Sequence, residues 1–211
     1  MRVMGIDEAG RGPVIGPMIV CGVVIEETNL SELFKRGVRD SKHLSPRRRK
    51  MLKREIELLA DEYAWIAIPP HQIDKERINE LELRSMVKLI ARFCPQKVFL
   101  DAPTPNPKSY ERRLRELLPH RIRVKLVVEN FADENYPVVG AASILAKVER
   151  DRRIAQLERR YGSFGSGYPS DKRTIDFLKE CFRRYGDFPP IVRRRWKTVE
   201  RLRERWGKGL S

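Results

Sequence analysis

The first 26 residues limit the possible folds of this chain most strongly. Residues 2–7 are mostly apolar and predict a short buried strand, and residues 18–26 form a second segment rich in β-branched side chains. Residues 10–17, which connect them, hold several glycines and prolines and are typical of a turn rather than a helix. Because this connection is short, we expect the two strands to pair antiparallel.

The rest of the chain alternates between apolar strand segments and longer segments of helical periodicity. This alternation is typical of parallel strands joined by helices. We therefore expect an α/β fold with a five-stranded mixed sheet flanked by helices, antiparallel at its start and parallel later. The further strands are expected at residues 63–68, 98–101 and 122–128. Helices are expected at residues 30–35, 46–59, 107–118 and 138–161, with one or two more over residues 72–93.

Residues 166–211 differ in pattern from the segment before them. The loop Gly-Ser-Gly-Tyr-Pro at residues 165–169 is followed by two predicted helices, 171–185 and 191–206, both rich in Lys and Arg. We therefore predict a main domain over residues 1–165 and a small, basic helical appendage over residues 166–211.

Acidic residues follow two of the predicted strands. Asp7 and Glu8 close the first strand, and Asp101 closes the apolar segment 98–100. If the two strands are neighbours, Asp7 and Asp101 come level at the carboxyl edge of the sheet, where open α/β folds bind ligands. Successive strand residues point to opposite faces, so Asp7 and Glu8 share a site only if the strand ends there and Gly10 turns the backbone.

Carboxylates gathered in one place raise each other's pKa, and a hard divalent cation relieves their repulsion. A donor set made only of oxygen atoms favours Mg²⁺ or Mn²⁺. Two such ions, about 3.5–4 Å apart, are a common arrangement for attack of water on a phosphodiester. The alternative is that each acid caps a turn or pairs with an arginine. The candidate catalytic acids and metal ligands are Asp7, Glu8, Asp101 and Asp133, with Glu134 as the alternative to Asp133.

Several other positions could bind a phosphate backbone. Glycines beside Arg11 allow close approach of backbone N–H groups to an anion, and Ser/Lys pairs are donors suited to phosphates. Tyr168 stands between Gly167 and Pro169 and could stack on a sugar or base, or only anchor its loop. The candidate substrate-binding residues are Gly10, Arg11, Gly12, Ser41, Lys42, Ser143, Lys147 and Tyr168.

The charge balance agrees with a polyanionic partner. The formal net charge is +15 and the pI is about 10.1, which is typical of nucleic-acid binding. A densely charged surface of a protein from a hot environment is the alternative. The cysteines have no zinc spacing and no signal peptide or membrane span is evident, so we expect a cytoplasmic protein.

Five ordered motifs together resemble ribonuclease HII in its archaeal form, and the resemblance extends to about residue 198. They are Gly5–Pro13, Asp40-Ser41-Lys42, Phe99-Leu100-Asp101-Ala102, the segment 142–151 (Ala-Ser-Ile-Leu-Ala-Lys-Val-Glu-Arg-Asp), and Gly167-Tyr168-Pro169.

This resemblance implies a ribonuclease H-like fold for the domain at residues 1–165 and a metal-dependent endonuclease. The implied substrates are the RNA strand of RNA–DNA hybrids and single ribonucleotides in duplex DNA, incised on their 5′ side to leave 3′-hydroxyl and 5′-phosphate ends. The family's four active-site acids fall on Asp7, Glu8, Asp101 and Asp133. Its reader of the 2′-hydroxyl falls on Gly10, Arg11 and Gly12, and the partner tyrosine on Tyr168.

Two other functions stay open at this point. One is a junction-resolving nuclease of the same fold, which needs no 2′-hydroxyl reader, and the other is a basic nucleic-acid-binding module without catalysis. We expect a monomer. Some archaeal relatives end in a peptide that binds a sliding clamp, and residues 204–211 lack its glutamine and paired aromatic residues.

Overall fold

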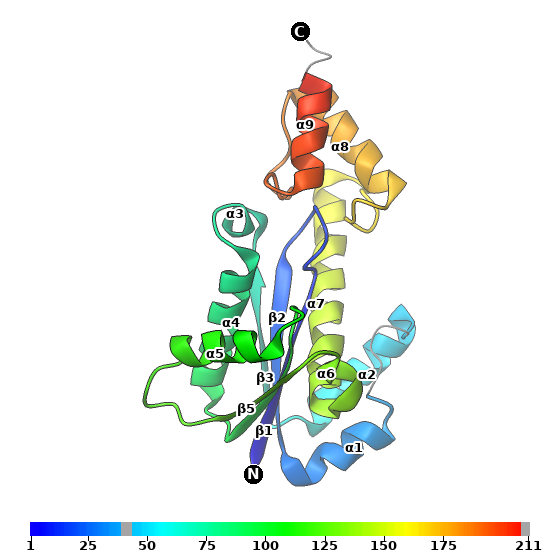
Figure 1. Cartoon of the computed structure of the whole chain (residues 1–211). Helices are drawn as coiled ribbons and strands as arrows, with labels where there is room; N and C mark the ends of the chain where they lie inside the picture. Colours follow the sequence, from blue (N-terminus) through cyan, green and yellow to red (C-terminus); the bar gives the residue numbers. More distant parts are fainter. Residues whose placement is uncertain (39–43, 208–211) are drawn as a thin grey trace. The chain divides into compact units, whose positions relative to one another are not determined.

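The computed structural model describes residues 1–38 and 44–207, which include one five-stranded sheet in the order β3-β2-β1-β4-β5 (Figure 1). β1 pairs antiparallel with β2 and parallel with β4, and β4 pairs parallel with β5. The predicted α/β fold and the mixed sheet are thereby confirmed. The strands are β1 (Arg2–Ala9), β2 (Met18–Glu26), β3 (Glu62–Ile68), β4 (Lys97–Asp101) and β5 (Lys125–Glu129).

Most predicted helices are present, with differences at their ends. Ser45 caps the second one: its hydroxyl accepts a 3.2 Å hydrogen bond from the backbone N–H of Arg48. The helices of residues 27–93 are η1 (Glu27–Asn29), α1 (Leu30–Lys35), α2 (Pro46–Leu59), α3 (Pro70–Ile73) and α4 (Ile78–Phe93). The later helices are α5 (Pro107–Leu117), α6 (Ala132–Asn135), α7 (Pro137–Tyr161), α8 (Lys172–Tyr185) and α9 (Lys197–Gly207).

Two of the boundaries predicted after residue 120 are wrong by three residues or more. The last helix was expected from residue 191 but begins at Lys197, because residues 191–193 form extended backbone contacts with residues 14–16. The fifth strand begins at Lys125 instead of residue 122, after a turn in which the N–H of Ile122 bonds to the carbonyl of Pro119.

The chain divides into two compact units that are not continuous in sequence. Unit 1 comprises Met1–Ala9, Ile19–Ile66 and Asn79–Glu149. Unit 2 comprises Gly10–Met18, Ala67–Ile78 and Arg150–Ser211. These units do not follow the division predicted at residue 165, because the segment after β1 belongs with the C-terminal helices.

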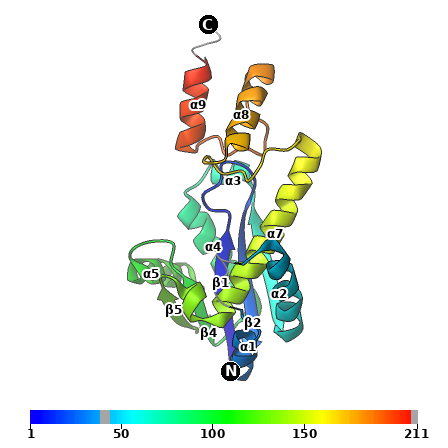
Figure 2. The same ribbon diagram turned by 90° about the vertical axis from the view of Figure 1, so that its right-hand side faces the viewer.

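Unit 1 holds most of the sheet, with helices on both faces. α4 and α5 lie on one side of β1 and β2, and α2 with the beginning of α7 lies on the other (Figure 2). Gly5 lets α7 approach closely, since a Cβ atom there would lie 2.1 Å from the carbonyl oxygen of Val138. This contact brings the beginning of α7 against the strand that carries Asp7.

Unit 2 has its own apolar core. Phe164, Leu178 and Phe182 are buried together with Val14 and Ile15, which come from the segment after β1. The C-terminal helices therefore pack around part of the predicted turn. Among the described residues, no helix is both long enough and apolar enough to span a membrane.

Candidate active site

The predicted adjacency of the first and fourth strands is confirmed. β1 and β4 run parallel, with Ile6 opposite Leu100 in their register. Asp7 and Asp101 are the next residues on each strand, so they stand level on neighbouring strands of unit 1. Two acids that are 94 positions apart in sequence are thereby placed side by side at one sheet edge.

Asp7 lies in a strongly perturbed environment. Its side chain is only 7% exposed, and burial, together with the charges of Glu8 and Asp101, raises its pKa well above the ordinary value. Hydrogen bonds from the Ser143 hydroxyl and from the backbone N–H of Glu8, the latter 2.7 Å from Asp7 Oδ1, act in the opposite direction. The net rise shows that negative charge at Asp7 is poorly compensated.

The first strand does not end at Asp7, which was the condition set for Glu8 to share a site with Asp7. We predicted that β1 would end at Asp7, but it continues through Ala9, with Glu8 opposite Val20. Glu8 is half-buried, and its charge is the second-largest cause of the raised pKa of Asp7, after burial. The two carboxylates are therefore electrostatically coupled even though the strand does not turn between them.

Asp101 and Asp133 are connected through the start of α6. Asp101 Oδ1 accepts a 3.0 Å hydrogen bond from the backbone N–H of Ala132. The preceding residue, Phe131, has a φ of 60°, and this left-handed residue turns the chain from β5 into the short helix. Asp133 is only 1% exposed, whereas Glu134 lies on the exposed side. Burial beside Asp101 favours Asp133 over Glu134 as the fourth acid.

The donor set of this cluster suits a hard divalent cation. The side chains of Asp7, Glu8, Asp101 and Asp133 offer only carboxylate oxygens, and Asp7 is destabilised by its charged neighbours. Among the described residues, no group of three or more His, Cys, Asp or Glu side chains is already arranged to hold a metal ion.

Ser143 belongs to this acidic cluster. It lies on α7, and its hydroxyl bonds to Asp7, so its predicted contact with a substrate phosphate remains a proposal. Lys147 follows one helical turn later and is half-buried. Ser41 and Lys42 lie outside the described residues.

Removal of the Ser143 hydroxyl tests its coupling to Asp7. Because the hydroxyl stabilises the ionised carboxylate, Ser143→Ala should raise the pKa of Asp7 further. We expect activity to fall more at the acidic end of the pH profile than at the basic end, with Ser143→Thr closer to the wild type. A pH profile of cleavage that is unchanged in Ser143→Ala would contradict the coupling.

Gly10, Gly12 and Tyr168 come together in unit 2. Gly10 has a φ of 89°, and a Cβ atom there would lie 2.6 Å from the side chain of Arg150. A Cβ atom on Gly12 would lie 3.5 Å from the Tyr168 ring. The predicted glycine element and its predicted aromatic partner are therefore neighbours, although they are far apart in sequence.

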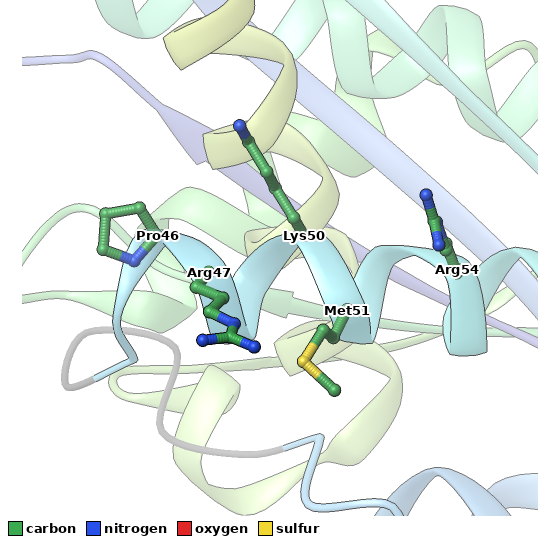
Figure 3. Close-up of a pocket in the computed structure, with 5 residues that line it drawn as sticks. All are labelled: Pro46, Arg47, Lys50, Met51 and Arg54. Atoms are coloured by element: carbon green, nitrogen blue, oxygen red, sulfur yellow. The ribbon is translucent and has the colours of Figure 1, made fainter.

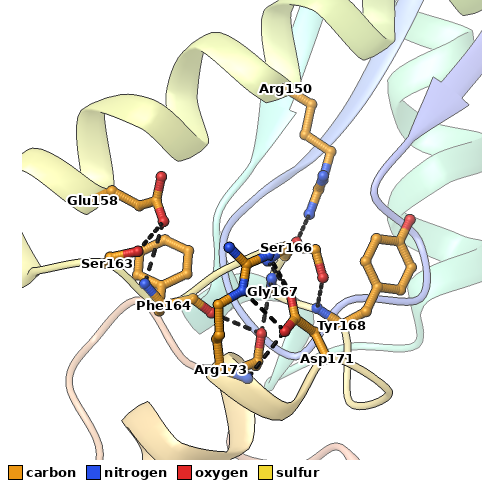
Figure 4. A network of polar contacts seen from close by, with 10 residues as sticks. Arg150, Glu158, Ser163, Phe164, Ser166, Gly167, Tyr168, Asp171 and Arg173 are labelled. Carbon is orange, nitrogen blue, oxygen red and sulfur yellow. Dashed lines mark hydrogen bonds and ion pairs between the residues drawn. The ribbon is translucent and has the colours of Figure 1, made fainter. Parts of the chain in front are cut away.

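The loop at residues 163–171 holds Tyr168 in place (Figure 4). The carboxylate of Asp171 accepts a 2.8 Å hydrogen bond from the N–H of Ser166, and the Thr174 hydroxyl accepts one of 3.1 Å from the N–H of Gly167. The Arg150 guanidinium lies 5.5 Å from the centre of the Tyr168 ring. The ring itself stays 39% exposed and can contact a ligand.

A basic stripe lies on α2 in unit 1. Arg47, Lys50 and Arg54, at helical spacing, line a pocket of about 380 Å³ together with Pro46 and Met51 (Figure 3). All three cationic side chains are exposed. Their arrangement suits a row of phosphates more than an enclosed small molecule.

Sequence reasoning missed two buried arginines of unit 2. Arg150 was noted only as part of a motif, and Arg193 only as one of many basic residues near the C-terminus. Arg150 is 2% exposed and Arg193 is 0% exposed. Nothing in the run Arg193-Arg194-Arg195 distinguishes the buried arginine from its two exposed neighbours.

The whole chain is similar to characterised proteins. A family profile described as Ribonuclease HII matches residues 4–199. Ribonuclease HII from Pyrococcus horikoshii is 44% identical over 99% of this chain and 96% of its own length. The crystal structure of ribonuclease H2 from P. horikoshii OT3 covers 99% of this chain and all of its own, with a TM-score of 0.92 and 43% identity. Ribonuclease HII from Archaeoglobus fulgidus, solved as a complex with PCNA, has a TM-score of 0.84 at 41% identity, covering 93% of this chain and 96% of its own.

Proposed function

We propose a metal-dependent incision activity for this chain, which belongs to the ribonuclease HII family and is therefore a type 2 ribonuclease H that cleaves RNA in RNA–DNA hybrids. The proposal adds incision on the 5′ side of single ribonucleotides in duplex DNA. The products would carry 3′-hydroxyl and 5′-phosphate ends. Family membership favours an enzyme over the non-enzymatic binding module.

One observation supports the cation requirement most strongly. Asp7 and Asp101 stand level on adjacent parallel strands, and the pKa of Asp7 is raised by burial and by two neighbouring carboxylates. Such a cluster is costly unless a positive charge joins it. The proposed ligands of Mg²⁺ or Mn²⁺ are Asp7, Glu8, Asp101 and Asp133.

When bound, a divalent cation would supply an activated water and neutralise charge that develops on the phosphate. The chain's own contribution is to hold the carboxylates in place. The Ser143 hydroxyl orients Asp7, and the N–H of Ala132 orients Asp101. Because Asp133 is buried next to Ala132, it is the acid best placed to join Asp101.

Choice of substrate would come from unit 2. The 2′-hydroxyl is the group that distinguishes RNA from DNA. Backbone groups of Gly10, Arg11 and Gly12 could contact it, with the neighbouring Tyr168 stacked on the sugar or base. A junction-resolving nuclease would not need this pair of features.

Contacts with phosphates would come from basic side chains on α2, α8 and α9, with Ser143 and Lys147 nearer the acids. Such binding releases counterions, so affinity falls as salt concentration rises. This contribution does not depend on base sequence.

Removal of the positive charges of the α2 stripe should weaken hybrid binding and reduce its dependence on salt. A variant in which Arg47, Lys50 and Arg54 are all changed to Gln should bind hybrids about tenfold or more weakly at 0.1 M salt. The slope of log affinity against log salt should fall by about 2 to 3, because each phosphate contact contributes about one. The matched control changes Lys108, Arg112 and Arg115 of α5 to Gln. Equal slopes for the two triple variants would refute the assignment.

One nicking assay tests the proposed function. The substrates are duplex DNA with a single ribonucleotide and the same duplex without it, each with Mg²⁺ or Mn²⁺. We expect a nick on the 5′ side of the ribonucleotide and none in the all-DNA duplex. Equal cutting of both would favour the junction-resolving class, and no cutting with either cation would overturn the proposal.

A further inference from the structure

Arg193 is fully buried in unit 2, and each of its guanidinium nitrogens donates to a backbone carbonyl. Nη2 donates to Gly10 O at 2.6 Å, Nη1 to Arg11 O at 2.9 Å, and Nε to Gly16 O at 3.0 Å. One side chain from near the C-terminus therefore binds backbone carbonyls at both ends of segment 10–16, which follows β1.

The backbone around Arg193 fixes the direction of its side chain. The N–H of Arg193 donates to Val14 O, and the N–H of Gly16 donates to Ile191 O, both at 2.8 Å. Ile15 and Val192 form an antiparallel bridge between these bonds. Residues 191–193, which carry Arg193, are thus paired with residues 14–16 of the segment that the Arg193 side chain binds.

The side chain of Trp196 binds the remaining carbonyl of residues 10–12. Trp196 Nε1 donates to Gly12 O at 3.3 Å, and the Arg193 guanidinium lies 5.1 Å from the centre of its ring. The carbonyls of Gly10, Arg11 and Gly12 are all engaged by this arginine and tryptophan. Residues 10–12 therefore have a fixed backbone, although two of them are glycines.

A buried arginine without a carboxylate is costly. Among the described residues Arg193 makes no ion pair, and burial together with the nearby charge of Arg150 lowers its pKa from the ordinary value. The guanidinium stays charged at neutral pH, and its charge is balanced by three carbonyl dipoles, the Trp196 ring and the more distant charge of Asp74. A role in stability alone could be filled by apolar side chains at lower cost.

Peptide geometry gives the direction of the N–H groups in the peptide units whose carbonyls face Arg193. The described chain contains no cis peptide bond, and in a trans peptide the N–H points away from the C=O of the same unit. With the carbonyls of Gly10 and Arg11 turned toward Arg193, the N–H groups of Arg11 and Gly12 point away from it. The next peptide has no N–H, because residue 13 is proline.

We propose that Arg193 is a positioning residue that holds the N–H groups of Arg11 and Gly12 toward the ribose of the substrate, beside Tyr168. This inference rests on the proposed reading of the 2′-hydroxyl by residues 10–12. Trp196 supports the same orientation through Gly12 O. Neither Arg193 nor Trp196 would contact the substrate itself.

The test compares two substrates under single-turnover conditions. The measured quantity is the ratio of kcat/KM for duplex DNA with one ribonucleotide to kcat/KM for a uniform RNA–DNA hybrid. Arg193→Lys keeps the charge but cannot donate to three carbonyls from a planar fork. We expect its ratio to fall about tenfold.

Two further variants separate positioning from stability. Leu178→Ala removes a buried side chain of the same core and should destabilise unit 2 without changing the ratio. Trp196→Phe keeps an aromatic ring but loses the indole N–H and with it the bond to Gly12 O, and we expect a fall of about threefold. This milder variant carries the test if Arg193→Lys does not fold.

Failure of the positioning role and failure of the proposed function give different results. A ratio within twofold of the wild type in both Arg193→Lys and Trp196→Phe, or an equal fall in Leu178→Ala, would overturn the positioning role. If the wild type itself does not distinguish the ribonucleotide duplex from all-DNA, the proposed function fails instead. Hydrogen exchange of the peptide covering residues 10–18 then tests the positioning alone: faster exchange in Arg193→Lys than in Leu178→Ala supports it, and equal exchange refutes it.

Discussion

Asp7→Asn should lower the rate of hybrid cleavage by about a thousandfold or more, while making the protein more stable at neutral pH. The rate falls because an amide cannot supply the charge that a divalent cation needs. The substitution keeps the shape of the side chain, so the hydrogen bond from the N–H of Glu8 can remain. Single-turnover cleavage of a uniform hybrid measures the loss.

The gain in stability follows from the sign of the pKa shift. The pKa of Asp7 is raised in the folded protein, so ionisation destabilises the fold once the pH exceeds the pKa of the unfolded chain, about 4. Asp7→Asn removes this cost, and we expect its free energy of unfolding to exceed that of the wild type at pH 7. The difference should shrink toward zero as the pH falls to about 4.

Denaturant unfolding without divalent cations at pH 4 and pH 7 measures this difference. Asp61→Asn is the matched control, because Asp61 is an exposed acid of the same unit. We expect no change in rate or stability for the control. A wild type that is more stable than Asp7→Asn at pH 7 would contradict the assigned environment of Asp7.

Tyr168→Ala should weaken the preference for an RNA–DNA junction by about tenfold and leave the cleavage of a uniform hybrid much less affected. Base or sugar stacking on an aromatic ring contributes about 1–3 kcal/mol. The ring is exposed, and the loop that holds it is fixed by Ser166, Asp171 and Thr174 rather than by the ring. Loss of the ring should therefore not unfold the loop.

The junction preference is measured as the ratio of cleavage rates on the two substrates. Tyr185→Ala is the control, since Tyr185 is an exposed tyrosine of the same unit. Unchanged junction preference in Tyr168→Ala would remove Tyr168 from the specificity site. A matching loss in the control would do the same.

The sheet and most helices could be predicted because their signals are local. The antiparallel start follows from the short turn-rich connection, and Ser45-Pro46 marks the beginning of α2. α6 was missed because four residues are too few for a helical period. The start of α9 was placed too early because residues 191–193 pair with residues 14–16, and the N–H groups of Arg194 and Arg195 donate to the Asp74 carboxylate. Both are tertiary effects.

The acids were predictable from their positions after strands and from the resemblance, whereas their coupling was not. Nothing local shows that Asp7 is buried or that Ser143 bonds to it. The burial of Arg193 depends on contacts between residues about 180 positions apart. Such contacts leave no periodic pattern in a single sequence.

If Asp7, Glu8, Asp101 and Asp133 form one cation site, the protein should bind Mn²⁺ through these four carboxylates. Calorimetric titration of the wild type should show saturable binding and a melting temperature that rises with Mn²⁺ concentration. A variant with both Asp7→Asn and Asp101→Asn should lose both effects, while Asp61→Asn keeps them. Equal Mn²⁺ affinity in the wild type and the double variant would contradict the account.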